Sequence, residues 1–546
     1  MADSVYPEES TAAHRHATRR MLHIAVWLGS ILVVLLVAFF ITGDIVLHHA
    51  GPLLKEKVVE TLSARFDSRV ELARFDVSVV KGFEVSGAGL KLFPNHLPTD
   101  EPLIEVDRFS FHVLNWHQLL RTPLYVNRVQ VNGLSIHLPP RSQRANLPHA
   151  GQSGAGGRLG DVKVLVGEIL VDHAHLVIEN GKPNKVPLDF QIDQLQLRSV
   201  GAGRPMQFHA ILVNPKPVGD IDSRGDFGPF DAESPGDTPV DGTYAFSHAD
   251  LSTLKGIGGM LSSTGSYRGQ LDRIEVDGET ETPDFRLDTA EHSLPLHTKF
   301  HAIVDGTNGD TQLEPVDAWL ARTHIVAKGG VVRAVNQPGH NIHLDVTVGP
   351  GRIEDLLQLA IKTDPPLMNG QVQVHTSFDL PPGKASVTDK LQLQGSFAVM
   401  DAHFSNEKFQ HDVDELSLRG QGNAQEAQQE NEAMKQGNND GATHADIGSD
   451  MRGNFILGEG KLTISALNYR VPGADIALSG VYTLDGQVFN FQGKARLDAH
   501  ISQMVTGWKS WLLKPVDPFF AKNGAGTQVP IKITGTKSSP QIGLNF

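Results

Sequence analysis

The chain contains no cysteine, and this absence excludes two classes of structure. Disulfide bonds and thiolate metal sites both need cysteine, so packing and strand pairing alone must hold the fold. Basic residues are also few. The 48 lysines and arginines stand against 62 aspartates and glutamates, which gives a net charge of −14 at pH 7. This balance argues against nucleic-acid binding and against a broad basic surface for anionic lipid headgroups.

Motifs for catalysis and for cofactor binding are missing as well. The segment GSYRG (265–269) has its serine in the wrong place for a nucleophile elbow, and the glycine-rich run 154–160 lacks the lysine of a phosphate-binding loop. The segment DGTNGD (305–310) lacks the ligand spacing of a calcium loop. His173 and His175 would share a strand face, but no third metal ligand accompanies them. We therefore expect no enzyme, no cofactor and no metal site.

One long hydrophobic run is present near the start of the chain. Residues 24–41, IAVWLGSILVVLLVAFFI, carry no charge. A helix of this length spans about 27 Å, close to the hydrocarbon thickness of a bilayer. We predict a membrane anchor over residues 21–43. The anchor residues that we single out are Ile24, Trp27, Leu32, Leu36, Phe39 and Ile41.

The flanks of this run predict its orientation. Arg15, Arg19 and Arg20 precede it, and no lysine or arginine follows it before Lys55. Because basic residues favour the cytoplasmic side, we place the polar and disordered tail 1–20 in the cytoplasm and the rest of the chain across the membrane. A cleaved signal peptide is the alternative, but no small-residue cleavage pattern follows the run.

The rest of the chain has the composition of a folded protein, with 40% hydrophobic and 20% charged residues. Residues 52–66 predict a short helix, because Leu54, Val58, Leu62 and Phe66 recur every four residues. Two interpretations remain open for this helix. It caps the near end of the next domain or lies at the bilayer, or it is an ordinary amphipathic helix packed on a core.

From Val70 onward the apolar residues alternate with a period of two, which predicts strands with one buried face. Within these strands the alternation repeatedly slips by one residue at an Asp or Asn. A slip of this kind needs either a two-residue hairpin, for which only Asn132-Gly133 is suited, or a β-bulge, which we favour because repeated bulges curl a sheet into a groove. The segments with this pattern are 104–111, 129–136, 169–176, 190–197 and, more loosely, 411–418.

Further along, the sequence predicts loops, turns and a few helices among the strands. Tyr482 is expected opposite Phe489 across an Asp-Gly turn. Other expectations are loops at 139–160 and 225–242, Asp-Gly turns at 277–278 and 305–306, helical runs at 351–362 and 501–512, and a disordered, Gln- and Asn-rich loop at 421–450.

Two stretches of this sequence resemble the AsmA-like family of bacterial envelope proteins. They are residues 62–93, LSARFDSRVELARFDVSVVKGFEVSGAGLKLF, and residues 480–546, which end in PIKITGTKSSPQIGLNF. The resemblance implies a single-pass protein of the bacterial inner membrane with a periplasmic β-groove. The expected organisation is an N-terminal AsmA-like groove (44–240), a central β region (241–420) and a C-terminal AsmA-like region with an amphipathic helix (451–546).

The predicted fold is therefore mainly β: an N-terminal transmembrane helix, then a long, strongly curved, mostly antiparallel groove with few short helices. The resemblance implies binding or conduction of phospholipid or other acyl chains for outer-membrane lipid homeostasis. From the length of the exported chain we expect that the sheet does not cross a wide periplasm alone and needs a partner, an oligomer or a shuttle-like role. The candidate partner is an outer-membrane or periplasmic protein. A scaffold for outer-membrane proteins that transports no lipid is the alternative, and an envelope hydrolase is the least favoured. The candidate groove residues are Ile104, Val106, Phe109, Phe111, Val129, Val131, Leu134 and Ile136.

Overall fold

The computed structural model describes most of the chain from residue 51 onward. The described residues are 51–78, 83–95, 101–113, 124–140, 143, 164–179, 186–201, 203–231, 234–288, 290, 292–334, 339–362, 364–435, 446–483, 488–504, 506, 527–536 and 539–544. The predicted tail (1–20) and the predicted anchor (21–43) lie outside them. Among the described residues, no helix has both the length and the hydrophobicity needed to span a membrane.

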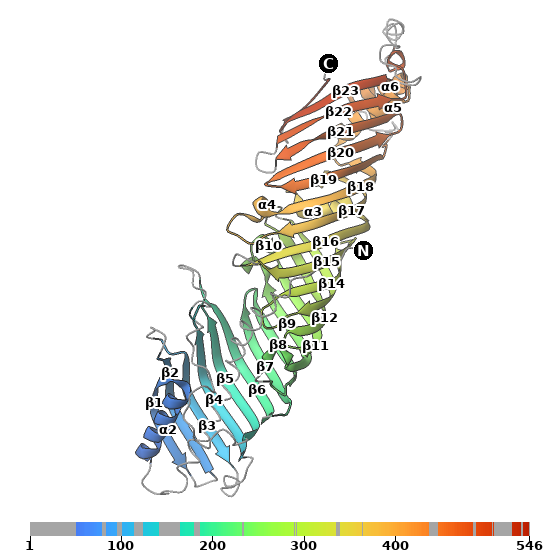
Figure 1. The fold of residues 1–546 in the computed structure, drawn as a ribbon. Coiled ribbons are helices and arrows are strands. Elements are labelled where there is room, and N and C mark those ends of the chain that lie inside the picture. Colours follow the sequence, from blue (N-terminus) through green and yellow to red (C-terminus); the bar gives the residue numbers. More distant parts are fainter. Residues whose placement is uncertain are drawn as a thin grey trace, which may run out of the picture. The chain divides into compact units, whose positions relative to one another are not determined.

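The described chain is mainly β. Its strands, β1 to β24, belong to one open sheet, and only a few short helices accompany them (Figure 1). This confirms the predicted mainly β, mostly antiparallel class. The chain divides into two compact units. Unit 1 comprises residues 1–254, 260–280 and 302–309, and unit 2 comprises residues 255–259, 281–301 and 310–546.

The described part of unit 1 starts with a helix and continues in strands that pair in sequence order. The pairs are antiparallel except for β4 and β5, which run parallel and therefore need a crossover connection. The predicted loop 139–160 lies between these two strands in the chain. The main elements are α2 (Gly51–Phe66), β1 (Ser68–Ser78), β2 (Phe83–Pro94), β3 (Ile104–Val113), β4 (Leu124–Leu138), β5 (Val164–Ile178), β6 (Leu188–Gly201), β7 (Met206–Pro215), β8 (Val218–Phe227), β9 (Pro239–Asp250) and β11 (Met260–Gln270).

A row of irregular residues, which we name the crease, crosses the first six strands of unit 1. At the crease the alternation of buried and exposed side chains slips by one residue: on β3, buried Val106 is followed by exposed Asp107 and Arg108, and then by buried Phe109. The paired registers of neighbouring strands all omit this row. The crease consists of Ala73, Gly89, Asp107, Gly133, His173 and Asp193.

The crease explains how the predicted slips are accommodated. Gly89, Gly133 and His173 have φ angles of 65°, 68° and 54°, and every strand continues through the row. Because both partners are irregular at the same position, the apolar side chains stay on one face while the register of the pair is kept. Each of the four segments between 104 and 197 does stay within one strand, so the hairpin alternative at Asn132-Gly133 is wrong. The predicted β-bulge, in which one strand gains a residue over its partner, occurs only where β6 pairs with β7, between Ile192 and Gln194; in the other pairings both strands are irregular together and the register is unchanged.

Helix α2 packs on the core of unit 1, as one of its two interpretations predicted. Val58, Leu62 and Phe66 are each 1% exposed and belong to the same hydrophobic cluster as the apolar side chains of β1 to β5. Lys55 Nζ also donates a hydrogen bond to the carbonyl of Ala73 at the crease, at 3.0 Å. The helix therefore closes the apolar face at this end of the unit.

Unit 2 contains a second run of antiparallel strands in sequence order. β12 and β13 contribute residues to both units. The strands are β10 (Ile257–Gly258), β12 (Arg273–Leu287), β13 (Ser293–Val304), β14 (Thr311–Leu320), β15 (Thr323–Arg333), β16 (His340–Arg352), β17 (Met368–Leu380), β18 (Gln392–Phe404), β19 (Ser449–Gly458), β20 (Lys461–Val471), β21 (Ala474–Thr483), β22 (Val488–Leu497), β23 (Thr527–Thr536) and β24 (Ser539–Leu544).

Among the described residues of unit 2, four α-helices accompany these strands: α3 (Ile353–Ala360), α4 (Val387–Lys390), α5 (Glu407–Gly420) and α6 (Ala424–Lys435). Helix α3 confirms the predicted helical run at 351–362. Helix α5 contradicts the fifth strand-slip segment, 411–418. It starts at an N-cap in which Asn406 Oδ1 accepts from the amide of Phe409, and its buried residues recur with helical spacing.

Helix α6 occupies part of the segment expected to be a disordered loop. Its Ala, Gln and Glu residues are good helix formers, and Ala424 and Ala427 are buried. The predicted pairing of Tyr482 with Phe489 and the turn at 305–306 are confirmed. The turn predicted at 277–278 is wrong, because these residues lie within β12. Of the helical run predicted at 501–512, residues 501–504 and 506 are described, and Ile501–Gln503 form a 3₁₀ turn.

Candidate functional site: the apolar face of the sheet

The predicted groove residues of unit 1 do share one face of the sheet. The register pairs Ile104 with Ile136, Val106 with Leu134, and Phe111 with Val129. Seven of the eight candidates are at most 7% exposed, and Val131 is half-buried. They belong to the same hydrophobic cluster as Val58, Leu62 and Phe66 of α2. In this structure they form a closed core rather than an accessible surface.

Unit 2 carries a second and longer apolar face. Residues that lie directly opposite each other in an antiparallel pair point to the same face, so the registers can be followed from strand to strand. From β15 onward they give three neighbouring rows without a charged side chain. Row 1 is Ile325, Val348, Val374, Phe397, Gly453, Leu467, Leu478, Gly493 and Ile531; row 2 is Ala327, Val346, Thr376, Gly395, Phe455, Ile464, Gly480, Phe491 and Ile533; row 3 is Gly329, Leu344, Phe378, Leu393, Leu457, Leu462 and Tyr482.

Two helices cover one margin of this face, on the side of row 1 away from row 2. Ile353 and Leu356 of α3 pack against a cluster that contains Val372 and Val399, which are 1% and 3% exposed. Val413 of α5 lies in another cluster, with Val471, Ala474 and Leu497. These helices complete a core along the margin.

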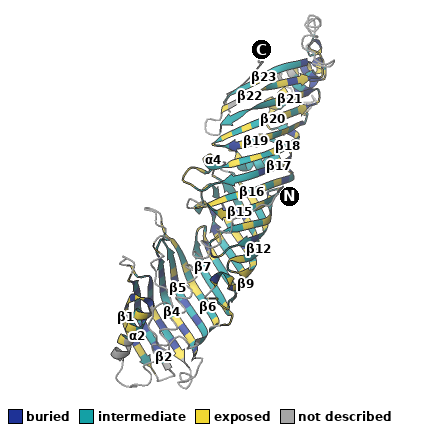
Figure 2. Ribbon diagram, viewed as in Figure 1, coloured by how far each residue is buried: buried dark blue, intermediate teal, exposed yellow. Residues whose placement is uncertain are grey.

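Beyond the covered margin, most side chains of the apolar face are half-buried (Figure 2). Phe455, Ile464 and Phe491 in row 2 and Leu393 and Leu462 in row 3 are all of this kind. Within the described residues, neither helix cluster extends to rows 2 and 3. The apolar face of unit 2 therefore includes a strip that no described helix seals.

Aromatic rings on this face lie over glycines of the neighbouring strand. A β-carbon at Gly453 would lie 2.8 Å from Cε1 of Phe397, and one at Gly480 would lie 2.5 Å from Cδ1 of Phe491. The absence of a side chain at these two positions lets the rings lie flat against the backbone. The apolar face consequently has a continuous floor.

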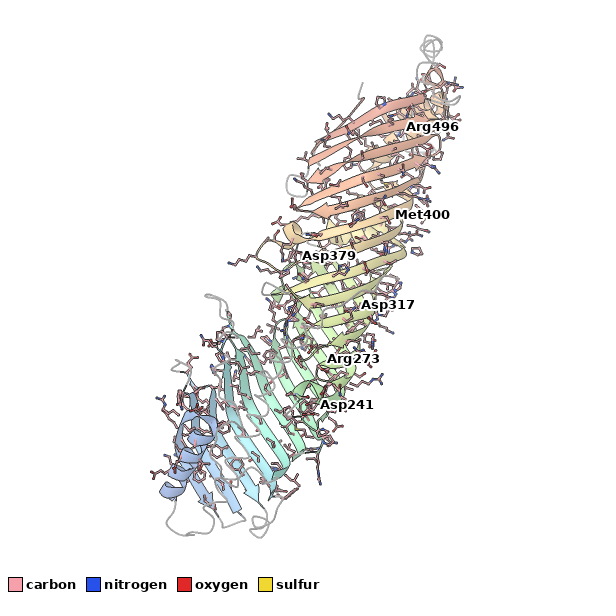
Figure 3. All side chains as sticks on the ribbon, in the orientation of Figure 1. Asp241, Arg273, Asp317, Asp379, Met400 and Arg496 are labelled. Carbon is pink, nitrogen blue, oxygen red and sulfur yellow. The ribbon has the colours of Figure 1, made fainter. Side chains whose placement is uncertain are left out.

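The opposite face of the same strands is polar and charged. His343 Nδ1 lies 2.5 Å from Asp379 Oδ1, His324 pairs with Asp317 at 2.9 Å, and Arg470 pairs with Asp475 at 2.7 Å. The hydrogen bond with Asp379 raises the pKa of His343 above its ordinary value. Asp317 and Asp379 are labelled in Figure 3. The two faces of unit 2 thus differ sharply in polarity.

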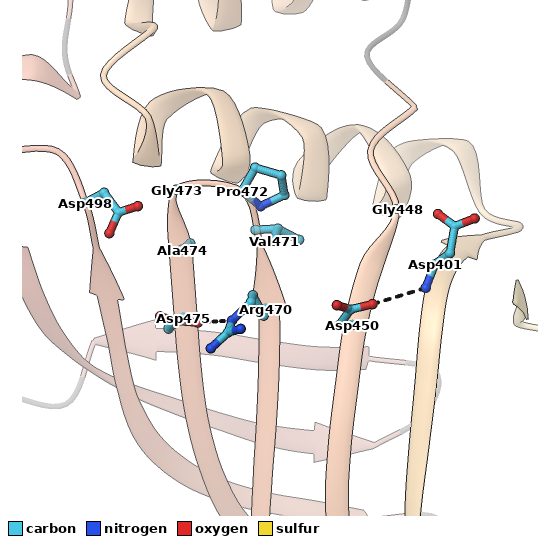
Figure 4. A pocket seen from close by; sticks show the side chains of 10 residues that line it. All are labelled: Asp401, Gly448, Asp450, Arg470, Val471, Pro472, Gly473, Ala474, Asp475 and Asp498. Carbon is cyan, nitrogen blue, oxygen red and sulfur yellow. Dashed lines mark hydrogen bonds and ion pairs between the residues drawn. The ribbon is translucent and has the colours of Figure 1, made fainter. Parts of the chain in front are cut away.

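A polar pocket of about 420 Å³ lies at the ends of strands β18 to β22 (Figure 4). Asp401, Asp450, Asp475 and Asp498 line it together with Arg470. Arg470 is already paired with Asp475, and Asp450 accepts a hydrogen bond from the amide of Asp401 at 3.2 Å. Among the described residues, no group of three or more side chains is arranged to hold a metal ion. Acidic side chains dominate the polar part of this lining, and Val471, Pro472 and Ala474 form its apolar part.

Comparison with known proteins adds no further constraint. No protein-family model, curated protein or solved structure matches this chain. The function must therefore be argued from the geometry of the sheet.

Sequence reasoning placed the candidate site in unit 1 and did not single out the strip in unit 2. The signal was present, because β16 to β22 alternate as regularly as β3 and β4. Alternation identifies a face but does not tell which helices cover it. This information required the packing of α2, α3 and α5 on their respective strands.

Proposed function

We propose that this protein binds the acyl chains of lipids on the apolar face of its sheet. The observation that carries the proposal is the strip formed by rows 2 and 3 of unit 2, which is apolar, half-buried and unsealed by any described helix. An apolar strip of this length that is only half-buried is unfavourable in water and typically marks a binding surface. Acyl chains match it, because they need no hydrogen bonds and follow a continuous floor.

The energetics favour a ligand with long hydrocarbon chains. Burial of each methylene group contributes about 0.8 kcal/mol, so ten methylenes on the strip contribute on the order of 8 kcal/mol before the cost of ordering the chain. The proposed setting is the inner membrane, with the predicted anchor holding a periplasmic groove that serves outer-membrane lipid homeostasis. Membership of the AsmA-like family, strong curvature of the sheet and a partner at the far end are parts of the same proposal.

A scaffold for outer-membrane proteins is the second candidate, favoured by the ends of the open sheet. In the described residues β1 pairs only with β2, and β24 pairs only with β23. Such edge strands can accept an added strand from another chain. A protein of this kind would use backbone groups at an edge, whereas a lipid-binding protein would use side chains across the face.

Mass spectrometry of lipids that copurify with the full chain tests the proposal. Leu393→Asp places a charge in row 3, and Gln394→Asp places the same charge on the exposed, polar face of the same strand. We expect Leu393→Asp to lose at least about tenfold of the bound lipid, since burying a carboxylate costs several kcal/mol, while Gln394→Asp keeps the wild-type amount. Circular dichroism of both variants checks that the sheet is intact. Equal lipid in the two folded variants, or no lipid in the wild type, would refute acyl-chain binding at this strip.

A further inference from the structure

Four hydroxyl-bearing side chains interrupt the apolar face of unit 1. The register continues one row of this face from Leu195 through Ala210 and Ser223 to Tyr244. A second row includes Tyr267, opposite Gly242, and a third includes Ser263, opposite Phe246. We name Ser223, Tyr244, Ser263 and Tyr267 the hydroxyl belt; all four lie on β8, β9 and β11 within unit 1.

The belt is held together by two tyrosine–serine hydrogen bonds. Tyr267 Oη lies 2.8 Å from Ser223 Oγ, and Tyr244 Oη lies 3.2 Å from Ser263 Oγ. Each ring lies over a glycine of the neighbouring strand, where a β-carbon would come within 3 Å of the ring: Gly242 for Tyr267, and Gly265 for Tyr244. The rings are consequently fixed against the sheet.

The direction of these hydrogen bonds follows from the other partners of the two serines. Ser223 Oγ donates to the carbonyl of Thr243 at 3.1 Å, and Ser263 Oγ donates to the carbonyl of Glu279 at 3.0 Å. A serine hydroxyl has one proton and a carbonyl only accepts, so all four bonds form only if each tyrosine donates to its serine.

Both tyrosines therefore keep acceptor capacity and have no proton left to donate. Burial raises the pKa of Tyr244, and its bond with Ser263 offsets part of the rise; burial also raises the pKa of Tyr267. The two phenols accordingly stay protonated at neutral pH. Both side chains are half-buried, and they stand on an otherwise apolar face.

We propose that the hydroxyl belt is a subsite for the polar end of a lipid and selects an end that carries a hydrogen-bond donor, such as an ammonium or a hydroxyl group. A donor on the lipid can form hydrogen bonds to the free lone pairs of Tyr244 and Tyr267, whereas an ester or phosphate oxygen meets no donor at the belt. The basic side chains of these strands that flank the belt, Arg224 and Arg268, occupy the alternate, exposed positions of β8 and β11 and point to the other face, as do the acidic Asp222 and Asp241. The subsite rests on the proposed acyl-chain binding and adds headgroup selection to it.

A competition experiment with the full chain separates the two proposals. The protein in detergent is offered equal amounts of three phospholipids with identical dioleoyl chains, and the bound lipid is quantified by mass spectrometry. Ethanolamine carries ammonium donors, glycerol carries hydroxyl donors, and choline carries no donor. We expect the wild type to enrich the first two over choline by about 2- to 10-fold, the factor that one added hydrogen bond gives.

The double variant Tyr244→Phe/Tyr267→Phe keeps both rings and removes both oxygens. It should bind a similar total of lipid with the enrichment lost. Tyr125→Phe removes an exposed tyrosine hydroxyl elsewhere in unit 1 and should keep the enrichment. Bound lipid without enrichment in the wild type, or enrichment that persists in the double variant, would overturn the subsite alone. Absence of all bound lipid would instead overturn the proposed function.

Discussion

The substitution Gly133→Ala tests whether the crease of unit 1 depends on backbone that only glycine adopts easily. Gly133 has a φ of 68° and lies opposite Asp107, and an added β-carbon would collide with the carboxylate of Asp107. The added methyl group therefore lowers the free energy of unfolding for two reasons, one conformational and one steric.

The magnitude can be estimated for each cost. The left-handed backbone region costs a residue with a β-carbon about 1–2 kcal/mol. Asp107 is exposed, so its carboxylate can rotate away, and a small backbone shift can relieve the remaining 2.8 Å contact with its β-carbon. The steric cost should then be about 1 kcal/mol. Together we expect the substitution to lower the free energy of unfolding of unit 1 by about 2–3 kcal/mol. In a double-mutant cycle, Asp107→Gly should remove the steric part and leave the conformational part.

Hydrogen exchange of the full chain, followed by mass spectrometry, measures this loss locally on β3, β4 and β5. Gly458→Ala is the matched control, because it lies in unit 2, has no positive φ and has no atom within 4 Å of the added β-carbon. Its exchange in unit 1 should equal that of the wild type. Unchanged protection of β3 to β5 in Gly133→Ala would refute the argument that the crease is under backbone constraint.

Three further predictions concern unit 2. Asp355 is 2% exposed and accepts hydrogen bonds from the Arg322 amide, the Arg322 guanidinium and the Thr323 hydroxyl at 3.1, 2.9 and 2.9 Å. Asp355→Ala should therefore lower the free energy of unfolding by about 3 kcal/mol and increase hydrogen exchange in α3. Asn406→Ala removes the N-cap of α5 and should lower the free energy of unfolding by about 1 kcal/mol in urea titrations. The raised pKa of His343 means that its pairing with Asp379 stabilises the folded state below the unfolded pKa of histidine and loses this effect as the pH rises through the folded pKa. The stability difference between wild type and His343→Gln should therefore be larger at pH 5.5 than at pH 8, and an equal difference at both values would contradict the pairing.

The strand slips were predictable because they leave a local signature. In the segment 104–111, two apolar pairs are separated by Asp107 and Arg108, and only a bulge-like irregularity keeps both pairs on one face. The segment 411–418 has a looser version of the same signature, yet Asn406 starts a helix there and its burial follows helical spacing. A short apolar pattern fits both the helical and the strand period, so the N-cap residue Asn406 just before this segment is the stronger signal.

The hydroxyl belt could not be predicted from the sequence, because its contacts join residues far apart in the chain. Ser223 and Tyr267 are separated by 44 positions and three strands share the belt. Their proximity depends on the register of β8, β9 and β11, which sequence alternation leaves free to shift by two residues. The same limit applies to rows 2 and 3 of unit 2, whose residues were visible as alternating apolar positions but not as neighbours.

The two proposed functions place different demands on the sheet, and unit 2 meets one set more fully. Strand addition at an edge needs free backbone groups at β1 or β24 and makes no use of the strands between them. A protein that works by strand addition would tolerate polar side chains at the apolar positions of β16 to β22, except along the margin where α3 and α5 pack. Instead, rows 2 and 3 continue across these strands without a charge, and rings lie over Gly453 and Gly480 to keep the floor continuous. A lipid-binding face needs this continuity, because one buried charge would interrupt the path of a hydrocarbon chain.

Scanning Asp through rows 2 and 3 should therefore reduce bound lipid at every position, whereas an edge-binding scaffold would tolerate these changes as long as the sheet stays folded.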